Sequence, residues 1–289
     1  MAIDPQKAIG AELPPIPVSW SFSQVLLYHL AIGAGSTPGD QLDTKSLAYT
    51  TEKGLAVLPT FAVVAPTLDE TGAPSVDLPG CDINLAQVVH GAQEVYVAKP
   101  IPTDVEGLTL TRRISDVWDK GSAAVIWQEH EAHDASGELV YRTRSSIFAK
   151  GAGGFGGERG SSDPVVLPDR APDATTSYTT TPQQALLYRL CGDRNPLHSD
   201  PDFAKLAGYP APILHGLCTY GITARLVVDA LLDGDVTRVG GFAARFAGVV
   251  FPGETIKVAA WDEADRIVIS ATVGDDDRPA LADCVLTKR

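Results

Sequence analysis

The sequence has few cysteines and few positive charges, and each shortage excludes a class of protein. Its four cysteines, Cys81, Cys191, Cys218 and Cys284, are far apart and form no CxxC pair. We therefore expect free thiols in a reducing compartment rather than a disulfide framework. Lysine and arginine number 23 against 36 aspartates and glutamates, which gives a net charge of −13. Because a protein that neutralises phosphates needs a basic face, we exclude nucleic acid as a partner.

Long apolar runs are also missing. No segment reaches the length that a transmembrane helix needs, and the first residues, MAIDPQKAIGAELPP, lack the layout of a signal peptide. We expect a cytoplasmic protein without a membrane span. The 289 residues, 44% of them hydrophobic, can form two ordinary domains or one large one.

A repeated motif indicates that the chain is a fused pair of related halves. QVLLYHLAIG begins at Gln24 and QALLYRLCGD begins at Gln184, an offset of 160 residues. Between them, the glycine-dense stretch KGAGGFGGERGSSD predicts a flexible connection. We assign the first half to residues 1–150, the linker to 151–162 and the second half to 163–289.

Each half is predicted to contain helices followed by an antiparallel sheet, which is an α+β fold class. In the second half, a capping box at Thr181 predicts a helix that ends near Gly192. The apolar run HGLCTYGITARLVVDALL predicts a second helix from about His215 to Leu232, and strand-like runs follow. The matching first-half segment, residues 48–64, contains a glycine and a proline that make it a poor helix. The first half therefore has room for something long and apolar.

The stretch YRLCGDRNPLHSDPDFA places three polar side chains directly behind an apolar run. Gly192 breaks the helix, and Pro196 disfavours helical backbone at the residue before it. Asp193, Asn195 and His198 therefore sit on a tight turn that can aim an acceptor, an amide and an imidazole toward one point. An ordinary Asx-type turn explains any one of them. The three together, followed by the HG pair of PILHGL, favour a catalytic site.

This stretch resembles the signature of the R-specific 2-enoyl-CoA hydratases, also called hydratase 2, in the MaoC-like dehydratase family. The signature is matched here by Tyr188, Cys191, Gly192, Asp193, Asn195, Pro196, Leu197, His198 and Ala204. The resemblance implies a double hot dog fold, in which curved antiparallel sheets wrap around a helix and the first half lacks its long central helix and holds the acyl chain. It also implies an acyl-CoA substrate and a place in fatty acid beta-oxidation.

The chemistry of hydration suits these residues. Adding water across the C2–C3 double bond of an enoyl thioester needs a base, an acid and donors for the charge that grows on the thioester oxygen. We expect Asp193 and His198 to hold one water, to abstract its proton and to return a proton to C2 on the same face. Asn195 would orient that water or lock the pair. The Gly216 N–H, at the start of the second helix, is the expected oxyanion donor; the alternative is a glycine required for packing.

Binding residues follow from the resemblance, position by position. The first half contributes His90 and Gly91 in QVVHGAQ and Lys120 in VWDKGSA, and the second half contributes Phe246. A lysine at this place can meet a phosphate of coenzyme A as a point charge. Within the signature, the expected substrate contacts are Arg194, Pro196 and Leu197. The first half has no Asn-Pro-x-His, so we expect it to be catalytically silent.

The sequence thus predicts a homodimeric enzyme that reversibly hydrates trans-2-enoyl-CoA to (3R)-3-hydroxyacyl-CoA. It is expected to use no metal or other cofactor, since coenzyme A is part of the substrate. The alternatives are an acyl-CoA or acyl-carrier-protein thioesterase, a hydroxyacyl-carrier-protein dehydratase and a non-catalytic acyl-CoA-binding subunit. HEAH at residues 130–133 lacks the HExxH spacing of a zinc site, and we expect both of its histidines to be solvated at a strand end.

Overall fold

The computed structural model of the protein describes residues 2–72, 77–83, 87–161 and 164–289. Residues 162–163, where the predicted linker meets the second half, lie outside the described residues. The α-helices are α1 (Pro5–Ala8), α2 (Phe22–Ala31), α3 (Thr44–Thr50), α4 (Gln184–Tyr188), α5 (Pro201–Leu206) and α6 (Gly216–Leu231). The strands are β1 (Ala2–Ile3), β2 (Glu12–Trp20), β3 (Cys81–Asp82), β4 (Val88–Val97), β5 (Val105–Asp119), β6 (Ala123–His133), β7 (Leu139–Lys150), β8 (Ala174–Thr179), β9 (Val239–Phe246), β10 (Thr255–Asp262), β11 (Arg266–Val273) and β12 (Arg278–Lys288).

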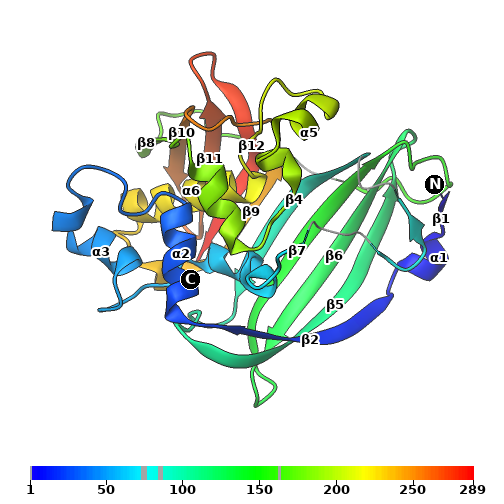
Figure 1. Ribbon diagram of the computed structural model, residues 1–289, viewed down its shortest axis with the longest axis horizontal. Coiled ribbons are helices and arrows are strands. Elements are labelled where there is room, and N and C mark those ends of the chain that lie inside the picture. Colours follow the sequence, from blue (N-terminus) through cyan, green and yellow to red (C-terminus); the bar gives the residue numbers. More distant parts are fainter. Residues whose placement is uncertain (1, 73–76, 84–86, 162–163) are drawn as a thin grey trace.

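Ten of these strands form one antiparallel sheet in the order β2-β5-β6-β7-β4-β9-β12-β11-β10-β8. Each half contributes five strands. Their order from the central β4–β9 pair to the edge is β4-β7-β6-β5-β2 in the first half and β9-β12-β11-β10-β8 in the second, which is the same arrangement. Figure 1 shows the sheet curving around the helices. The predicted α+β double hot dog fold is confirmed.

The helix α6 fills the inside of the second half (Figure 1). It contacts β8, β9, β10 and β12, and eleven of its sixteen residues are buried. Its predicted bounds, His215 to Leu232, agree with the structure, where these two residues cap the helix. A helix that is apolar on most sides fits this enclosed position.

The two copies of the repeated motif pack against each other in space. They form α2 and α4, and the rings of Tyr28 and Tyr188, at the same place in each motif, lie 6.3 Å apart. The Gln184 side-chain amide donates to the backbone carbonyl of Ala31 over 2.6 Å. This contact joins the two halves directly behind the turn that carries Asp193.

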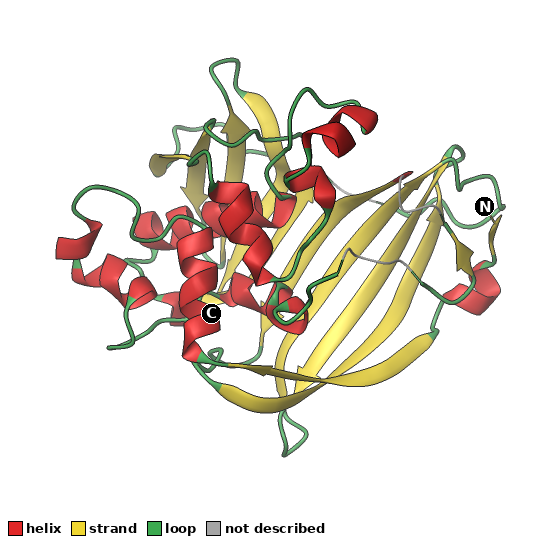
Figure 2. Ribbon diagram, viewed as in Figure 1, coloured by secondary structure: helices red, strands yellow, loops and turns green. Residues whose placement is uncertain are grey.

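The first half is built differently on its inner face. Its segment 48–64 contains only the end of α3 and a 3₁₀ helix, Pro59–Val63, so no helix in the described part of this half is as long as α6. In Figure 2 no helix as long as α6 lies in front of the strands β5, β6 and β7. The prediction that the first half lacks its central helix is confirmed. None of the described helices is long and apolar enough to span a bilayer.

The first strand that each half contributes to the large sheet was not predicted from the sequence. These strands, β2 and β8, form the two outer edges of the large sheet. The sequence of β2, ELPPIPVSW, contains three prolines and no clear alternation of apolar and polar residues. Proline is tolerated on an edge strand because one side of such a strand needs no backbone donors.

The glycine-rich linker is anchored, in contrast to the predicted flexible connection. The Asp119 carboxylate, at the end of β5, accepts hydrogen bonds from the N–H groups of Gly154 and Gly156, over 2.9 and 2.8 Å. Gly160 packs against the Trp118 ring so closely that a Cβ there would lie 2.1 Å from a ring atom. The expectation of flexibility is therefore wrong for residues 154–160.

Candidate active site

The signature turn is fixed by one glycine and one proline. Gly192 has a φ of 108°, and a Cβ built on it would lie 1.8 Å from the Thr67 carbonyl oxygen. No other residue type fits at this position without moving the backbone. The 3₁₀ helix Pro196–His198 then begins at once, with proline at its first position. The chain therefore turns sharply between α4 and His198, as predicted.

The Asn195 amide and backbone stabilise this turn from within. The Asn195 side-chain oxygen accepts a hydrogen bond from the Leu197 N–H, over 3.1 Å. The Asn195 N–H donates to Asp193 Oδ1, also over 3.1 Å. Asn195 thus caps the 3₁₀ helix and holds the carboxylate in place, which is the local role that its residue type favours.

The His198 ring is buried and held in one tautomer. Its Nδ1 lies 2.8 Å from the Ile213 carbonyl oxygen, which can only accept, so Nδ1 carries the proton and Nε2 keeps a lone pair. Burial lowers the pKa of His198, while the Asp193 carboxylate and the bond to Ile213 act in the opposite direction. A neutral imidazole with a bare Nε2 is a base ready to accept a proton.

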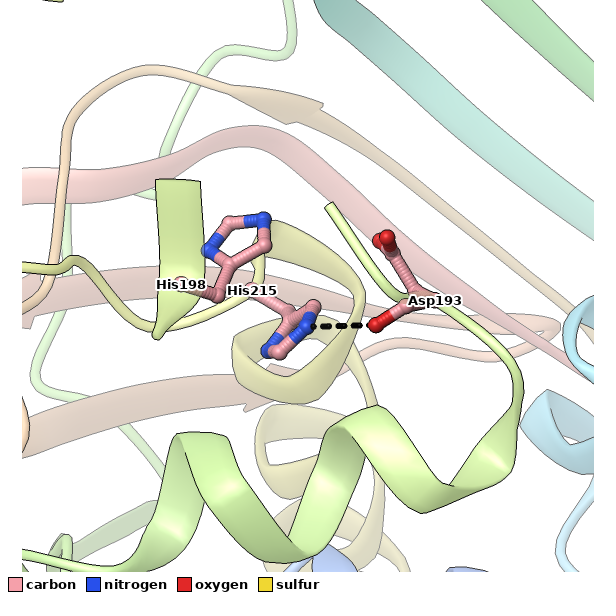
Figure 3. Close-up of side chains that lie close together, drawn as sticks. All are labelled: Asp193, His198 and His215. Carbon is pink, nitrogen blue, oxygen red and sulfur yellow. Dashed lines mark hydrogen bonds between the residues drawn. The ribbon is translucent and has the colours of Figure 1, made fainter. Parts of the chain in front are cut away.

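Asp193, His198 and His215 form one compact cluster (Figure 3). Ligand atoms of the three side chains all lie within 4.8 Å of one another. A single water with hydrogen bonds of about 2.8 Å to the carboxylate and to the imidazole fits such a gap. The carboxylate and the imidazole therefore lie close enough to share a water, and the sharing itself stays a prediction.

His215 supports the cluster from below. Its ring stacks on the His198 ring, with centroids 3.7 Å apart and planes at 28°. Its Nε2 donates to the Asp193 backbone carbonyl over 3.3 Å, the dashed line in Figure 3. Burial and the neighbouring His198 hold its pKa well below the ordinary range, so it is neutral. His215 is the N-cap residue of α6, but its side chain makes no capping bond. It holds the Asp193 backbone through a hydrogen bond and the His198 ring through stacking instead.

Gly216 begins α6 beside the ring of Phe246, at the end of β9, and this ring in turn contacts a histidine of the first half. A Cβ on Gly216 would lie 2.9 Å from the Phe246 ring, so any side chain would push that ring away. The Phe246 ring lies 4.7 Å from the His90 ring. His90 Nε2 donates to the Ala92 carbonyl over 3.1 Å. Desolvation by the surrounding protein lowers the pKa of His90, although water still reaches its exposed ring and limits this shift. His90, Phe246 and Gly216 thus form one wall next to the cluster.

A cavity of about 500 Å³ opens beside the signature turn. Asp193 and Asn195 line one part of it, and the chain segment that replaces the missing central helix lines another. Its apolar wall consists of Ile16, Val63, Val64, Pro66, Leu110 and Leu217. The signature turn therefore faces a partly apolar space bordered by the first half, the half to which the resemblance assigns the acyl chain.

The remaining predicted residues lie farther from the cluster. Lys120 is in the turn between β5 and β6, where its ammonium group lies 4.9 Å from the centre of the Trp118 ring and 3.4 Å from the Gly160 carbonyl. This turn is at the end of the sheet where β4 begins, the end that carries His90. Arg194 donates to the Glu70 carbonyl over 3.4 Å. No contact of either cation with Asp193 or His198 is present among the described residues.

Two residues of the cavity wall were not found from the sequence. His130, expected at a strand end in solvent, is half-buried and lines the cavity from within β6, and Arg112 lies beside it. The two are paired across β5 and β6. The alternation of strand residues could have indicated both. Arg112 lies two residues after the buried Leu110 and His130 two residues before the buried Ala132, so all four side chains are on the inner face of the sheet.

Comparison with known proteins agrees with this geometry. Residues 19–151 match the MFE-2 hydratase 2 N-terminal domain, and residues 165–277 match the MaoC like domain. Enoyl-CoA hydratase ChsH3 of Mycobacterium tuberculosis is 50% identical over 281 residues, which are 97% of each chain. The peroxisomal multifunctional enzyme type 2 of Mus musculus is 39% identical over 263 residues, 90% of this chain and 35% of the mouse protein.

A solved structure also supports the similarity to MaoC-like dehydratases. The MaoC-like dehydratase from Phytophthora capsici superimposes with a TM-score of 0.88 at 27% identity and covers 99% of this chain and 98% of its own. Both halves are therefore accounted for, the second by the domain that carries the signature turn and the first by its hydratase 2 partner domain. This chain belongs to the MaoC-like dehydratase family, in the two-domain form that pairs a hydratase 2 N-terminal domain with a MaoC like domain.

Proposed function

We propose that this protein reversibly adds water across the double bond of a trans-2-enoyl-CoA to give a (3R)-3-hydroxyacyl-CoA. One observation carries the proposal: the Asp193 carboxylate and the His198 imidazole lie within 4.8 Å of each other beside an apolar cavity. The names of the relatives, enoyl-CoA hydratase and peroxisomal multifunctional enzyme, support the same reaction. The protein is then a hydro-lyase.

In the proposed mechanism, Asp193 and His198 hold one water between them. The bare Nε2 of His198 accepts a proton from this water as its oxygen bonds to C3, and the pair returns a proton to C2. Water and proton come from the same side of the double bond, so the addition is syn. Asn195 keeps the carboxylate in position through its backbone N–H. Reversal of the same steps removes water from the hydroxyacyl product.

The charge that forms on the thioester oxygen needs a donor, and we assign this role to the Gly216 N–H. It is the first residue of a sixteen-residue helix, where N–H groups have no partner within the helix and the helix dipole favours negative charge. A donor fixed in place before the reaction stabilises the transition state without reorganisation. The close Phe246 ring also requires a glycine here, so packing and catalysis both favour this residue.

We further propose that coenzyme A lies along the β4 side of the site. His90, Gly91 and Phe246 would flank the thioester, and Lys120, at the same end of the sheet, would meet a phosphate. Within the signature turn, Arg194, Pro196 and Leu197 complete the predicted contacts. The acyl group would enter the cavity of the first half.

The proposed reaction needs no metal and no redox cofactor, because proton transfer alone adds water and no atom requires an external electron donor. Dialysis against a chelator is expected to leave turnover unchanged. A homodimer and a cytoplasmic location stay predictions; sedimentation of the purified protein tests the first and imaging of a tagged chain tests the second.

The direct test replaces Asp193 by asparagine. We expect turnover of trans-2-enoyl-CoA, followed by loss of enoyl absorbance, to fall by about a hundredfold or more, since a positioned acid or base contributes on this scale. His198→Gln should show a similar loss. Asp200→Asn is a matched control: Asp200 caps α5 in the same segment, and asparagine is an equally good cap.

Three outcomes would contradict the proposal. Near-normal turnover in Asp193→Asn would remove the mechanism. Release of free thiol from acyl-CoA would instead indicate a thioesterase on the same fold. A product of S configuration in a chiral assay would contradict the assigned face of addition.

A further inference from the structure

Where β5 and β6 form the cavity wall of the first half, they contribute two polar side chains that an unsubstituted alkyl chain would not need. Across β5 and β6, Arg112 pairs with His130 and Leu110 pairs with Ala132. Leu110 and Ala132 are fully buried, so the face that all four share is the inner one. Arg112 and His130 both line the same cavity as Asp193. They lie within its otherwise largely apolar wall.

Arg112 lacks the acidic partner that its neighbours have. Arg113 pairs with Glu129 over 2.7 Å, and Arg144 pairs with Asp116 over 3.0 Å, both on the outer face of the sheet. Among the described residues, no carboxylate lies within ion-pair distance of Arg112, whose one hydrogen bond goes to the Pro14 carbonyl over 2.8 Å. Its Nε is buried without any hydrogen-bond partner. A guanidinium that lines a cavity without a neutralising carboxylate favours a ligand that brings an oxygen acceptor to its N–H groups.

His130 offers a second unused polar group beside this guanidinium. Its ring makes no hydrogen bond within the described residues. Burial, aided by the adjacent Arg112, lowers the pKa of His130 to about 4, so the ring is neutral and keeps one N–H donor at neutral pH. Besides Asp193, the one acidic lining residue of the cavity is Glu70, which is exposed. The pair therefore presents donors and positive charge, which suit an oxygen acceptor and reject a cation.

The pair lies away from the reacting end of the site. His90, on β4, marks the thioester end through its contact with Phe246. The strand order β4-β7-β6-β5 places His130 two strands from β4 and Arg112 three strands away. At a spacing of about 4.8 Å per strand, these positions are roughly 10 and 14 Å across the sheet. Donors at this distance meet the far end of an acyl group, not the thioester.

We propose that the acyl group of the substrate carries a carbonyl or carboxylate oxygen at its far end, and that Arg112 and His130 bind this oxygen. The inference rests on the proposed hydratase function and names its substrate class. An Arg can hold such an oxygen through a charge-assisted hydrogen bond that a plain alkyl end cannot make. Arg112 and His130 are thus specificity-determining residues, remote from the chemical step.

The test compares three thioesters of equal chain length: trans-2-decenoyl-CoA, the same compound ending in a methyl ketone, and the same compound ending in a carboxylate. We expect kcat/KM of the wild type to be about tenfold higher for at least one oxygenated substrate than for decenoyl-CoA, the scale of one hydrogen bond to a charged group. The two oxygenated compounds distinguish a carbonyl from a carboxylate. In Arg112→Met the preference should disappear. Arg113→Met, one residue along and on the outer face, is the matched control and should keep it.

The possible results distinguish a failure of the inference about the substrate from a failure of the proposed hydratase function. A wild type that hydrates all three substrates equally would overturn this inference and leave the proposed function standing, whereas a wild type that hydrates none of them would overturn the proposed function. An equal loss of preference in Arg113→Met would also overturn the role of Arg112. Should Arg112→Met not fold, calorimetry on the wild type decides: decanoyl-CoA must bind about tenfold more weakly than its better oxygenated counterpart, and equal binding refutes the inference.

Discussion

Substitution of Gly192 by alanine tests how rigidly the fold positions the catalytic turn. A Cβ at this residue would lie 1.8 Å from the Thr67 carbonyl oxygen, and real Cβ contacts essentially never fall below 3.0 Å. The turn or the Thr67 segment must therefore move by about 1.2 Å. The left-handed backbone costs an alanine roughly 1–2 kcal/mol, and forcing an extra carbon into a packed site costs a further 1–3 kcal/mol, approximately. The expected loss of unfolding free energy is the sum, roughly 2–5 kcal/mol.

Gly208 provides the matched control for this prediction. It also has a positive φ, 89°, but a Cβ there meets nothing within 4 Å. Gly208→Ala should therefore lose only the backbone part, roughly 1–2 kcal/mol. Urea unfolding followed by the fluorescence of the four tryptophans measures both variants. The difference between the two losses isolates the collision with Thr67.

The same displacement should reach catalysis, because Asp193 directly follows Gly192. A misplacement of about 1 Å in a positioned catalytic group can cost about a hundredfold in rate. We expect kcat of Gly192→Ala to fall by tenfold to about a hundredfold at a temperature where it is fully folded, and kcat of Gly208→Ala to stay near the wild-type value. Equal stability losses in the two variants, together with a normal kcat for Gly192→Ala, would refute the reasoning.

Three further predictions follow from the buried histidines and the linker. Because burial lowers the pKa of His198 and the base must be neutral, the acid limb of kcat/KM should lie below pH 6.5, the usual value for histidine; a limb above it contradicts this. The pKa of the fully buried His29 is about 4 in the fold against about 6.5 unfolded, so unfolding free energy should fall by about 1.4 kcal/mol per pH unit as pH drops from 6.5 to 4, and His29→Gln should show a slope smaller by that amount in urea titrations. Asp119→Ala should free Gly154 and Gly156 and speed limited proteolysis of the linker by several-fold, while an unchanged cleavage rate means that the carboxylate does not anchor it.

Local chemistry made much of the site predictable. The turn at Gly192 and Pro196 follows from backbone rules that act over two or three residues, and the signature then placed Asp193 and His198 on it. The stacking of His215 on His198 could not be predicted in the same way, because it depends on how the start of α6 meets a turn seventeen residues earlier in the chain. Only the assembled fold brings the two rings together.

Errors arose where tertiary position overrides local pattern. The strand β2 was missed because its three prolines argue against a strand unless it lies at an edge, and edge position is a property of the whole sheet. His130 was expected in solvent because it was placed at a strand end, whereas β6 continues to His133. Its side chain faces inward all the same, since alternate residues of β6 share the inner face.

The prolines of β2 also affect the tendency of this protein to aggregate through its sheet edge. An open sheet of ten strands has outer rims that could recruit strands from other chains and grow into aggregates. Pro14, Pro15 and Pro17 have no N–H groups, so the β2 edge offers fewer donors to an incoming strand than an ordinary strand would. Replacing them with valine would therefore endanger solubility more than fold, an unusual case in which a poor strand sequence protects the strand that it forms.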